Sequence, residues 1–301
     1  MTRTHKMPGT EPGTCPPAYE AGADVYEFGG DGPVLHIAHA NGFPPGTYRP
    51  LAATLTDRYR VIGLPARPLW PGSRPEEVNG WRPLAADLVR GLDRLGLRGI
   101  IGIGHSMGGV ITLWAAVDRP DLFRAVVLID PVILPPHWLR LVQVMRWFGL
   151  TPRPSLVRGT LHRRRTWPDR QSCYEYFRSR PFFAAWPEES LWAYVEAGTR
   201  QRPDGGVELV YPPEWEARIF STIPTDVWQA IPQLRAPTLV IRGERSTTFF
   251  PQAQQQMERW LPHARFVVIP DAGHMVPLER PAEVGAAIRE YLETLKDVPG
   301  A

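Results

Sequence analysis

The strongest constraint on the fold is an alternation of strand and helix patterns in two separate stretches of the chain. Fully apolar segments such as residues 99–104 and 125–129 are typical of strands buried in a parallel sheet. The expected strands are 24–29, 33–40, 59–64, 99–104, 125–129, 238–242 and 265–269, and the expected helices are 48–57, 84–95, 107–117, 252–261 and 282–295. This alternation predicts an α/β fold with a mainly parallel, doubly wound sheet.

The alternation stops between residues 132 and 225, which indicates a segment inserted into the α/β core. Residues 131–225 hold 15 of the 31 aromatic residues. We expect a core formed by residues 22–131 and 226–301, a mainly helical cap or lid at 132–225, and a mobile, proline-rich leader at 1–21. An amphipathic pattern over 138–150 predicts a pocket-lining helix, with Trp138, Met145 and Phe148 as candidate substrate-pocket residues. The aromatic residues could equally form the core of the cap.

A nucleophile motif lies between an expected strand and an expected helix. Residues 104–108 read Gly-His-Ser-Met-Gly and match the pattern G-x-S-x-G. A sharp turn at Ser106 would strain its backbone, and both flanking glycines are needed because larger side chains would clash. The hydroxyl would be lifted out of the sheet at a helix N-terminus, which favours developing negative charge. This context predicts that Ser106 is a catalytic nucleophile.

A serine hydroxyl is a poor nucleophile until a base takes its proton, and His274 is the best candidate for that base. It follows the expected strand 265–269, at the carboxyl end where α/β sheets place their sites. Competing histidines lie in the leader, inside a strand, in the insert or at a helix end. We therefore predict that His274 is the general base.

Together these motifs resemble those of α/β-hydrolase-fold enzymes that carry a cap domain. The resemblance covers roughly residues 22–296 and rests on the segments 39–44 (HANGFP), 104–109 (GHSMGG), 129–131 (IDP), 237–244 (PTLVIRGE) and 273–274 (GH). It implies a serine, histidine and acid triad. It also implies an oxyanion hole, made by the backbone N–H of Met107 and that of either Asn41 or Phe43. The resemblance is specific for the fold but only weakly specific for the substrate.

The acid is the member of the triad that departs from the common family pattern. Most relatives carry an aspartate in a Gly-Glu-x-Asp segment, where this chain has Ser246. A serine cannot supply the charge that stabilises an imidazolium. Some relatives carry the acid after the sixth strand instead, where Asp130 stands here. We predict Asp130, with Glu244 as the second candidate and Asp226 and Asp271 as weaker ones.

Composition excludes several other classes of protein. The two cysteines, Cys15 and Cys173, form no disulfide framework and no zinc site. A formal charge of +3 is too balanced to argue for nucleic acid, and no apolar run is long enough for stable membrane insertion. We expect a cytoplasmic protein that needs no metal and no cofactor. The sequence does not indicate an oligomeric state.

The nucleophile narrows the chemistry that the resemblance implies. Haloalkane dehalogenases and epoxide hydrolases of this fold use an aspartate at the position of Ser106. A serine implies attack on an ester-like carbonyl and an acyl-enzyme. We predict a carboxylesterase-like serine hydrolase acting on small apolar esters. A carbon–carbon bond hydrolase, a lactonase, an acyltransferase or a perhydrolase would use the same triad. A non-catalytic small-molecule binding protein is the alternative from a different class.

Overall fold

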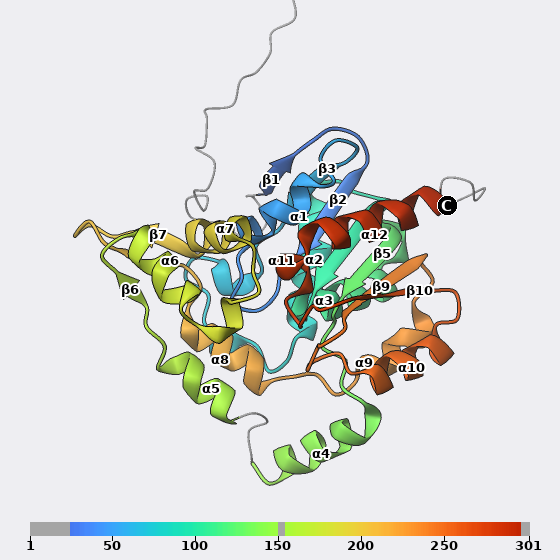
Figure 1. The fold of residues 1–301 in the computed structure, drawn as a ribbon. Helices are drawn as coiled ribbons and strands as arrows, with labels where there is room; N and C mark the ends of the chain where they lie inside the picture. The colour runs from blue at the N-terminus through green and yellow to red at the C-terminus, as the bar shows by residue number, and fades with distance from the viewer. Residues whose placement is uncertain (1–24, 150–153, 296–301) are drawn as a thin grey trace, which may run out of the picture.

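The computed structural model describes residues 25–149 and 154–295, so the expected leader at 1–21 lies outside the described residues. Its centre is a seven-stranded sheet in the order β1-β3-β2-β4-β5-β9-β10 (Figure 1). In this sheet β1 runs antiparallel to β3, and the other neighbouring strands are parallel. The strands are β1 (Tyr26–Gly29), β2 (Val34–Ala38), β3 (Arg60–Gly63), β4 (Ile100–His105), β5 (Phe123–Ile129), β9 (Thr238–Gly243) and β10 (Arg265–Ile269). The predicted α/β fold with a mainly parallel sheet is confirmed.

Both faces of the sheet are covered by helices. Val126 and Leu128 of β5 join one hydrophobic core, and Val127 and Ile129 join the other, because successive strand side chains point to opposite faces. The first core includes side chains of α2 (Arg82–Arg94), α3 (Met107–Asp118), α9 (Val227–Ala230) and α10 (Pro251–Trp260). The second includes side chains of α1 (Arg49–Ala53), α11 (Val276–Glu279) and α12 (Pro281–Thr294). Near-continuous apolar strands are what such a doubly covered sheet requires.

The strand register brings several loops to one edge of the sheet. His105 at the end of β4 pairs with Ile129 at the end of β5, and Ile129 pairs with Ile241 of β9. Gly243 at the end of β9 pairs with Ile269 at the end of β10. The residues that follow these strands therefore emerge side by side, although they lie far apart in the sequence.

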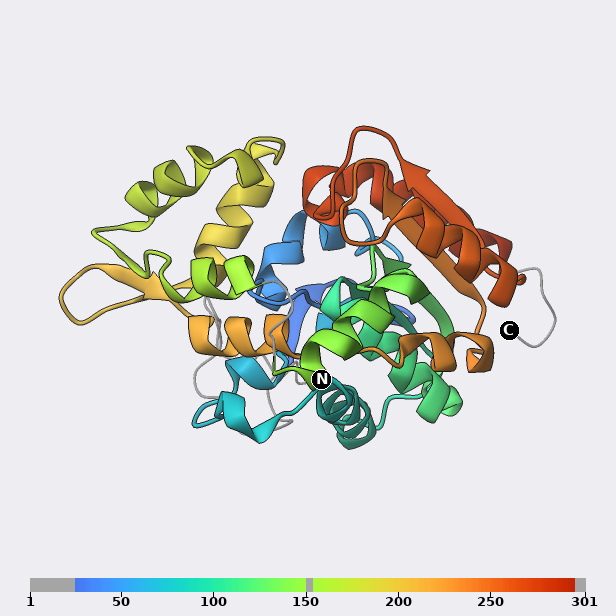
Figure 2. The same cartoon turned by 90° about the horizontal axis from the view of Figure 1, so that it is seen from below.

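The segment between β5 and α9, called the insert below, contains strands that the sequence analysis did not anticipate. A three-stranded antiparallel sheet has the order β6-β8-β7. Its strands have only two or three residues each, too few to show a periodic pattern. The elements are α4 (Pro136–Trp147), α5 (Pro154–Leu161), β6 (Thr166–Trp167), α6 (Arg170–Arg178), α7 (Glu188–Gly198), β7 (Thr199–Gln201), β8 (Val207–Leu209) and α8 (Pro213–Ser221). In both views the small sheet, α6 and α7 lie to one side of the core (Figures 1 and 2).

The helix expected at 138–150 exists as α4, but its aromatic residues are not where the pattern placed them. Its buried stripe consists of Leu139 and Val142, which belong to the first core. Trp138 and Phe148 are 47% and 75% exposed, because they lie outside that stripe. Within the described residues no helix is long and apolar enough to cross a membrane.

Candidate active site

Ser106 occupies the tight bend between β4 and α3. Its φ of 57° lies in the left-handed region that side chains rarely adopt. The two flanking glycines are required by close backbone contacts. A Cβ at Gly104 would lie 2.3 Å from the Gly108 carbonyl oxygen, and one at Gly108 would lie 2.1 Å from that of Ala38. This turn holds the Ser106 hydroxyl at the first turn of α3, at the carboxyl edge of the sheet.

His274 stands on the loop between β10 and α11 and contacts both other members of the expected triad. Its Nε2 lies 2.8 Å from Ser106 Oγ, and its Nδ1 lies 2.7 Å from Asp130 Oδ1. The carboxylate requires the ring proton on Nδ1, which leaves Nε2 free to accept the hydrogen bond from the serine hydroxyl. This is the geometry that general-base activation of a serine needs.

Asp130 follows β5 directly, and its carboxylate is fully buried. The backbone N–H of Gly243 donates to Oδ2 at 2.9 Å, and the hydroxyl of Ser246 donates to Oδ1 at 2.6 Å. The Oδ1 atom therefore accepts from both Ser246 and His274, and Oδ2 accepts from the backbone of Gly243.

Glu244, the second candidate for the acid, lies elsewhere. Its side chain is exposed, and its carboxylate accepts a hydrogen bond from the backbone N–H of Asp271 at 2.9 Å. Asp226 contacts Arg82 on the surface. The structure thus brings Asp130 to His274 and leaves the other three carboxylates away from it. Ser246 was missed as a contributor, although its place in the Gly-Glu-x-Asp pattern was the available signal.

The loop 39–44 contains the remaining candidates for the oxyanion hole. The N–H of Phe43 donates to the Ala40 carbonyl at 3.2 Å and so closes a turn within the loop. The Asn41 side chain is anchored to the insert, since its Nδ2 donates to the Glu216 carbonyl and its Oδ1 accepts from the Tyr211 hydroxyl. Neither the backbone N–H of Asn41 nor that of Met107 donates to another described residue. Both residues line the cavity at Ser106.

A buried polar chain connects this loop with the loop of His274. The backbone N–H of Ala40 donates to the Tyr48 hydroxyl oxygen at 2.9 Å, and that hydroxyl donates to His105 Nδ1 at 2.7 Å. His105 Nε2 then donates to the His274 carbonyl at 2.9 Å. Burial, together with the nearby His274, lowers the pKa of His105 to about 3, so the ring stays neutral. Sequence patterns gave no signal for Tyr48.

The cavity at Ser106 and His274 has a volume of about 250 Å³ and is mainly apolar. Residues of the insert that line it include Leu156, Phe182, Ile219, Phe220 and Ile223. Trp138, Met145 and Phe148, the expected pocket residues, are not among the lining residues. No aspartate, glutamate, lysine or arginine of the described chain lines this cavity.

Neither this cavity nor the rest of the described chain offers a site for a metal. Within residues 25–149 and 154–295 there is no group of three or more histidine, cysteine, aspartate or glutamate side chains that could hold an ion. The polar side chains that line the cavity are Ser106, His274, Asn41, Thr247 and Thr248. This donor set suits acid–base and nucleophilic chemistry by side chains.

Known proteins that are similar to this chain include hydrolases. The chain is 27% identical over 268 residues to 2-(acetamidomethylene)succinate hydrolase from Mesorhizobium japonicum, a match that covers 88% of this chain and 89% of the relative. It is 24% identical over 307 residues to bifunctional epoxide hydrolase 2 from Sus scrofa, and this match covers 88% of the chain. The chain spans about half of that relative, because the match covers only 52% of the relative's length.

A solved structure gives a third comparison. A thermophilic esterase from Thermogutta terrifontis superposes with a TM-score of 0.62 at 26% identity, covering 90% of this chain and 93% of that one. A family model described as alpha/beta hydrolase fold matches residues 41–281, which include the bend at Ser106 and the loop of His274. The chain therefore belongs to the alpha/beta hydrolase fold family.

Proposed function

We propose that this hydrolase cleaves small, apolar carboxylic esters through an acyl-enzyme on Ser106. The observation that carries the proposal is the contact of His274 with both Ser106 and Asp130, at 2.8 and 2.7 Å. Such a chain of hydrogen bonds makes a serine nucleophilic without a metal or a cofactor. An aspartate nucleophile, as expected for epoxide hydrolysis on this fold, is absent from the position of Ser106.

The reaction follows from the positions of these atoms. Ser106 Oγ attacks the ester carbonyl carbon while His274 Nε2 takes the hydroxyl proton. The N–H groups of Met107 and Asn41 stabilise the resulting oxyanion; we favour Asn41 over Phe43 because the Phe43 N–H already donates to Ala40. His274 returns the proton to the departing alcohol. Water, deprotonated by the same ring, then releases the acid and restores Ser106, while Asp130 stabilises the imidazolium throughout.

The lining of the cavity supports an uncharged substrate. A succinate derivative, as in the name of one relative, carries carboxylates that need cationic partners. None of the described lining residues is cationic. The aromatic and aliphatic side chains, among them Phe43, Trp81 and Phe220, suit an apolar acyl or alcohol group. We also propose that the insert is the cap, because side chains of α5 and α8 line the cavity and would exclude water from it.

Turnover of p-nitrophenyl esters of graded acyl length tests the proposal. Ser106→Ala should abolish turnover without changing thermal unfolding. Asp130→Asn should lower kcat by roughly 10⁴-fold, the typical cost of a lost triad acid. Glu244→Gln is the matched control and should change kcat less than about threefold, because its carboxylate does not touch His274. The opposite ranking of these two variants would place the acid at Glu244.

A fluorophosphonate probe separates an enzyme from a binding protein on the same fold. An activated serine should react covalently with the probe, and the label should map to Ser106 by mass spectrometry. Folded wild-type protein that takes up no label would refute serine catalysis and favour a non-catalytic function.

A further inference from the structure

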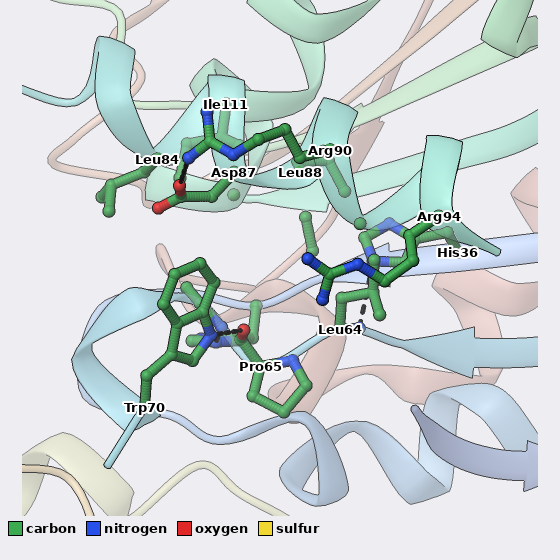
Figure 3. Close-up of a pocket in the computed structure, with 15 residues that line it drawn as sticks. His36, Leu64, Pro65, Trp70, Leu84, Asp87, Leu88, Arg90, Arg94 and Ile111 are labelled. Atoms are coloured by element: carbon green, nitrogen blue, oxygen red, sulfur yellow. Dashed lines mark hydrogen bonds and ion pairs between the residues drawn. The ribbon is translucent and has the colours of Figure 1, made fainter. Parts of the chain in front are cut away.

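A second cavity lies behind the oxyanion loop, on the side of α2 (Figure 3). His39 and Gly108 line this cavity, whereas their neighbours Ala40 and Met107 line the cavity at Ser106. The loop 39–44 and the first turn of α3 thus form a wall between the two. The second cavity, called the α2 cavity below, contains neither Ser106 nor His274.

The walls of the α2 cavity are apolar and include one large aromatic ring. Leu64, Leu84, Leu88 and Ile111 line it together with Trp70. The indole N–H of Trp70 donates to the Pro65 carbonyl at 2.8 Å, which fixes the ring. In Figure 3 the Trp70 ring lies across the cavity from the side chains of α2. Such a wall can stack on a flat apolar group.

The charged groups of the α2 cavity are predominantly cationic. Asp87 is buried, and both of its carboxylate oxygens accept from Arg67 at 2.7 Å, while Arg90 forms a further ion pair with it. The negative charge of Asp87 is therefore compensated. Arg94, which also lines the cavity, forms no ion pair or hydrogen bond with any other described residue, and its side chain is exposed. The cavity thus presents one cation that has no partner among the described residues.

A buried hydrogen-bond donor also lacks an acceptor there. His36 lines the cavity and is only 1% exposed. Its Nε2 accepts the backbone N–H of Leu64 at 3.1 Å, so the proton of the neutral ring lies on Nδ1. Nδ1 has no hydrogen-bond partner among the described residues. A buried donor left unpaired is costly, and an acceptor from a ligand would remove that cost.

We propose that the α2 cavity binds a small carboxylate with an apolar body the size of one ring. The carboxylate would pair with Arg94 and accept from His36, and the apolar body would lie against Trp70 and the leucines. The volume sets the size: about 130 Å³ is close to the roughly 150 Å³ of an apolar cavity that accommodates benzene. A cation is not favoured, since Asp87 is already paired with two arginines.

Benzoate is the probe that tests this assignment, by titration of the full chain followed by NMR. We expect saturable one-to-one binding, with shifts at the His36 Nδ1–H. Arg94→Gln should raise the Kd for benzoate about two- to fivefold, the loss expected for one exposed ion pair. Arg235→Gln is the matched control, because Arg235 is exposed and lines neither cavity. It should leave the Kd unchanged.

Benzyl alcohol separates the charge from the ring, and we expect it to bind at least fivefold more weakly than benzoate. Equal affinity of wild type and Arg94→Gln for benzoate, or shifts confined to the Ser106 cavity, would overturn the proposal. So would the absence of any saturable shift. None of these readouts uses ester turnover, so they remain informative if the proposed hydrolysis fails.

Discussion

Acidification should unfold this protein, because three histidine rings are buried in a neutral state. His36, His39 and His105 are each no more than 2% exposed. Burial, with a contribution from neighbouring His39, lowers the pKa of His36 to about 3, and burial lowers that of His39 to about 4. The Nε2 atoms of both rings accept backbone N–H groups, from Leu64 and Ala66, so a proton added there would face a donor.

The size of the effect follows from these pKa values. In the unfolded chain a histidine takes up a proton near pH 6.5, whereas the folded rings do so only near pH 3 to 4. Their contribution to stability is therefore fully present above pH 6.5 and is lost as the pH falls toward 3. At pH 5 each ring lowers the free energy of unfolding by about 2 kcal/mol, because pH 5 lies about 1.5 units below the unfolded pKa and one unit corresponds to about 1.4 kcal/mol. Together the three rings lower the free energy of unfolding by about 6 kcal/mol at pH 5. This is comparable with the whole stability of many domains, about 5–15 kcal/mol.

Chemical denaturation at pH 7 and at pH 5 measures this loss directly. We expect the free energy of unfolding to fall by about 4 kcal/mol, because burial raises the pKa of Glu216 to about 7 and its protonation in the folded chain offsets about 2 of the 6 kcal/mol. His36→Gln should make this fall smaller by about 2 kcal/mol, because one titrating ring is removed. His263→Gln, at an exposed position, is the control and should retain it. A decrease smaller than about 2 kcal/mol between pH 7 and 5 would refute the assignment of three neutral buried rings.

Two further substitutions test how the site is held. Gly108→Ala should lower the melting temperature by more than about 5 °C and abolish ester turnover, because its Cβ would lie 2.1 Å from the Ala38 carbonyl oxygen. The control is Gly159→Ala in α5, where a Cβ meets no atom within 4 Å. Differential scanning fluorimetry should show this control to be neutral or slightly stabilising. Ser246→Ala should lower kcat about tenfold at unchanged KM, because the hydrogen bond to Asp130 is lost. Ser179→Ala, which removes an exposed hydroxyl, is the control and should leave kcat unchanged. Equal kinetics of the two serine variants would contradict the role given to Ser246.

The core could be predicted from sequence because its signals are local. Strands such as β4 and β5 are buried on both faces, so they appear as unbroken apolar runs bounded by turns. The bend at Ser106 needs small flanking residues, because Gly104 packs against Gly108 and Gly108 packs against the Ala38 carbonyl, and that requirement shows directly as two glycines. A strand–turn–helix pattern around them is enough to predict the local backbone.

The insert was predicted less well because its contacts are not local. Apolar residues of α4 occur on both sides of the helix, and only the packing of Leu139 and Val142 decides which side is buried. Contacts between loops that lie far apart in the sequence are equally hard to predict. The Asn41 side chain is held by Tyr211 and Glu216, which lie 170 and 175 residues later in the chain. No periodic sequence pattern links positions so far apart.

The position of Asp130, the proposed acid, shows how topology adds to a sequence motif. In the sheet order β4-β5-β9, the loop after β5 lies between the loop of the nucleophile and the loop after β9. Asp130 and Ser246 come from these adjacent loops, and their side-chain oxygens lie 2.6 Å apart. A carboxylate from either strand could therefore reach the same ring nitrogen of His274. Once the acid stands after β5, the position after β9 needs a hydrogen-bond donor, because a second carboxylate there would repel the first. The serine in the Gly-Glu-x-Asp segment is thus the chemical complement of Asp130, and the two positions are best interpreted as one site.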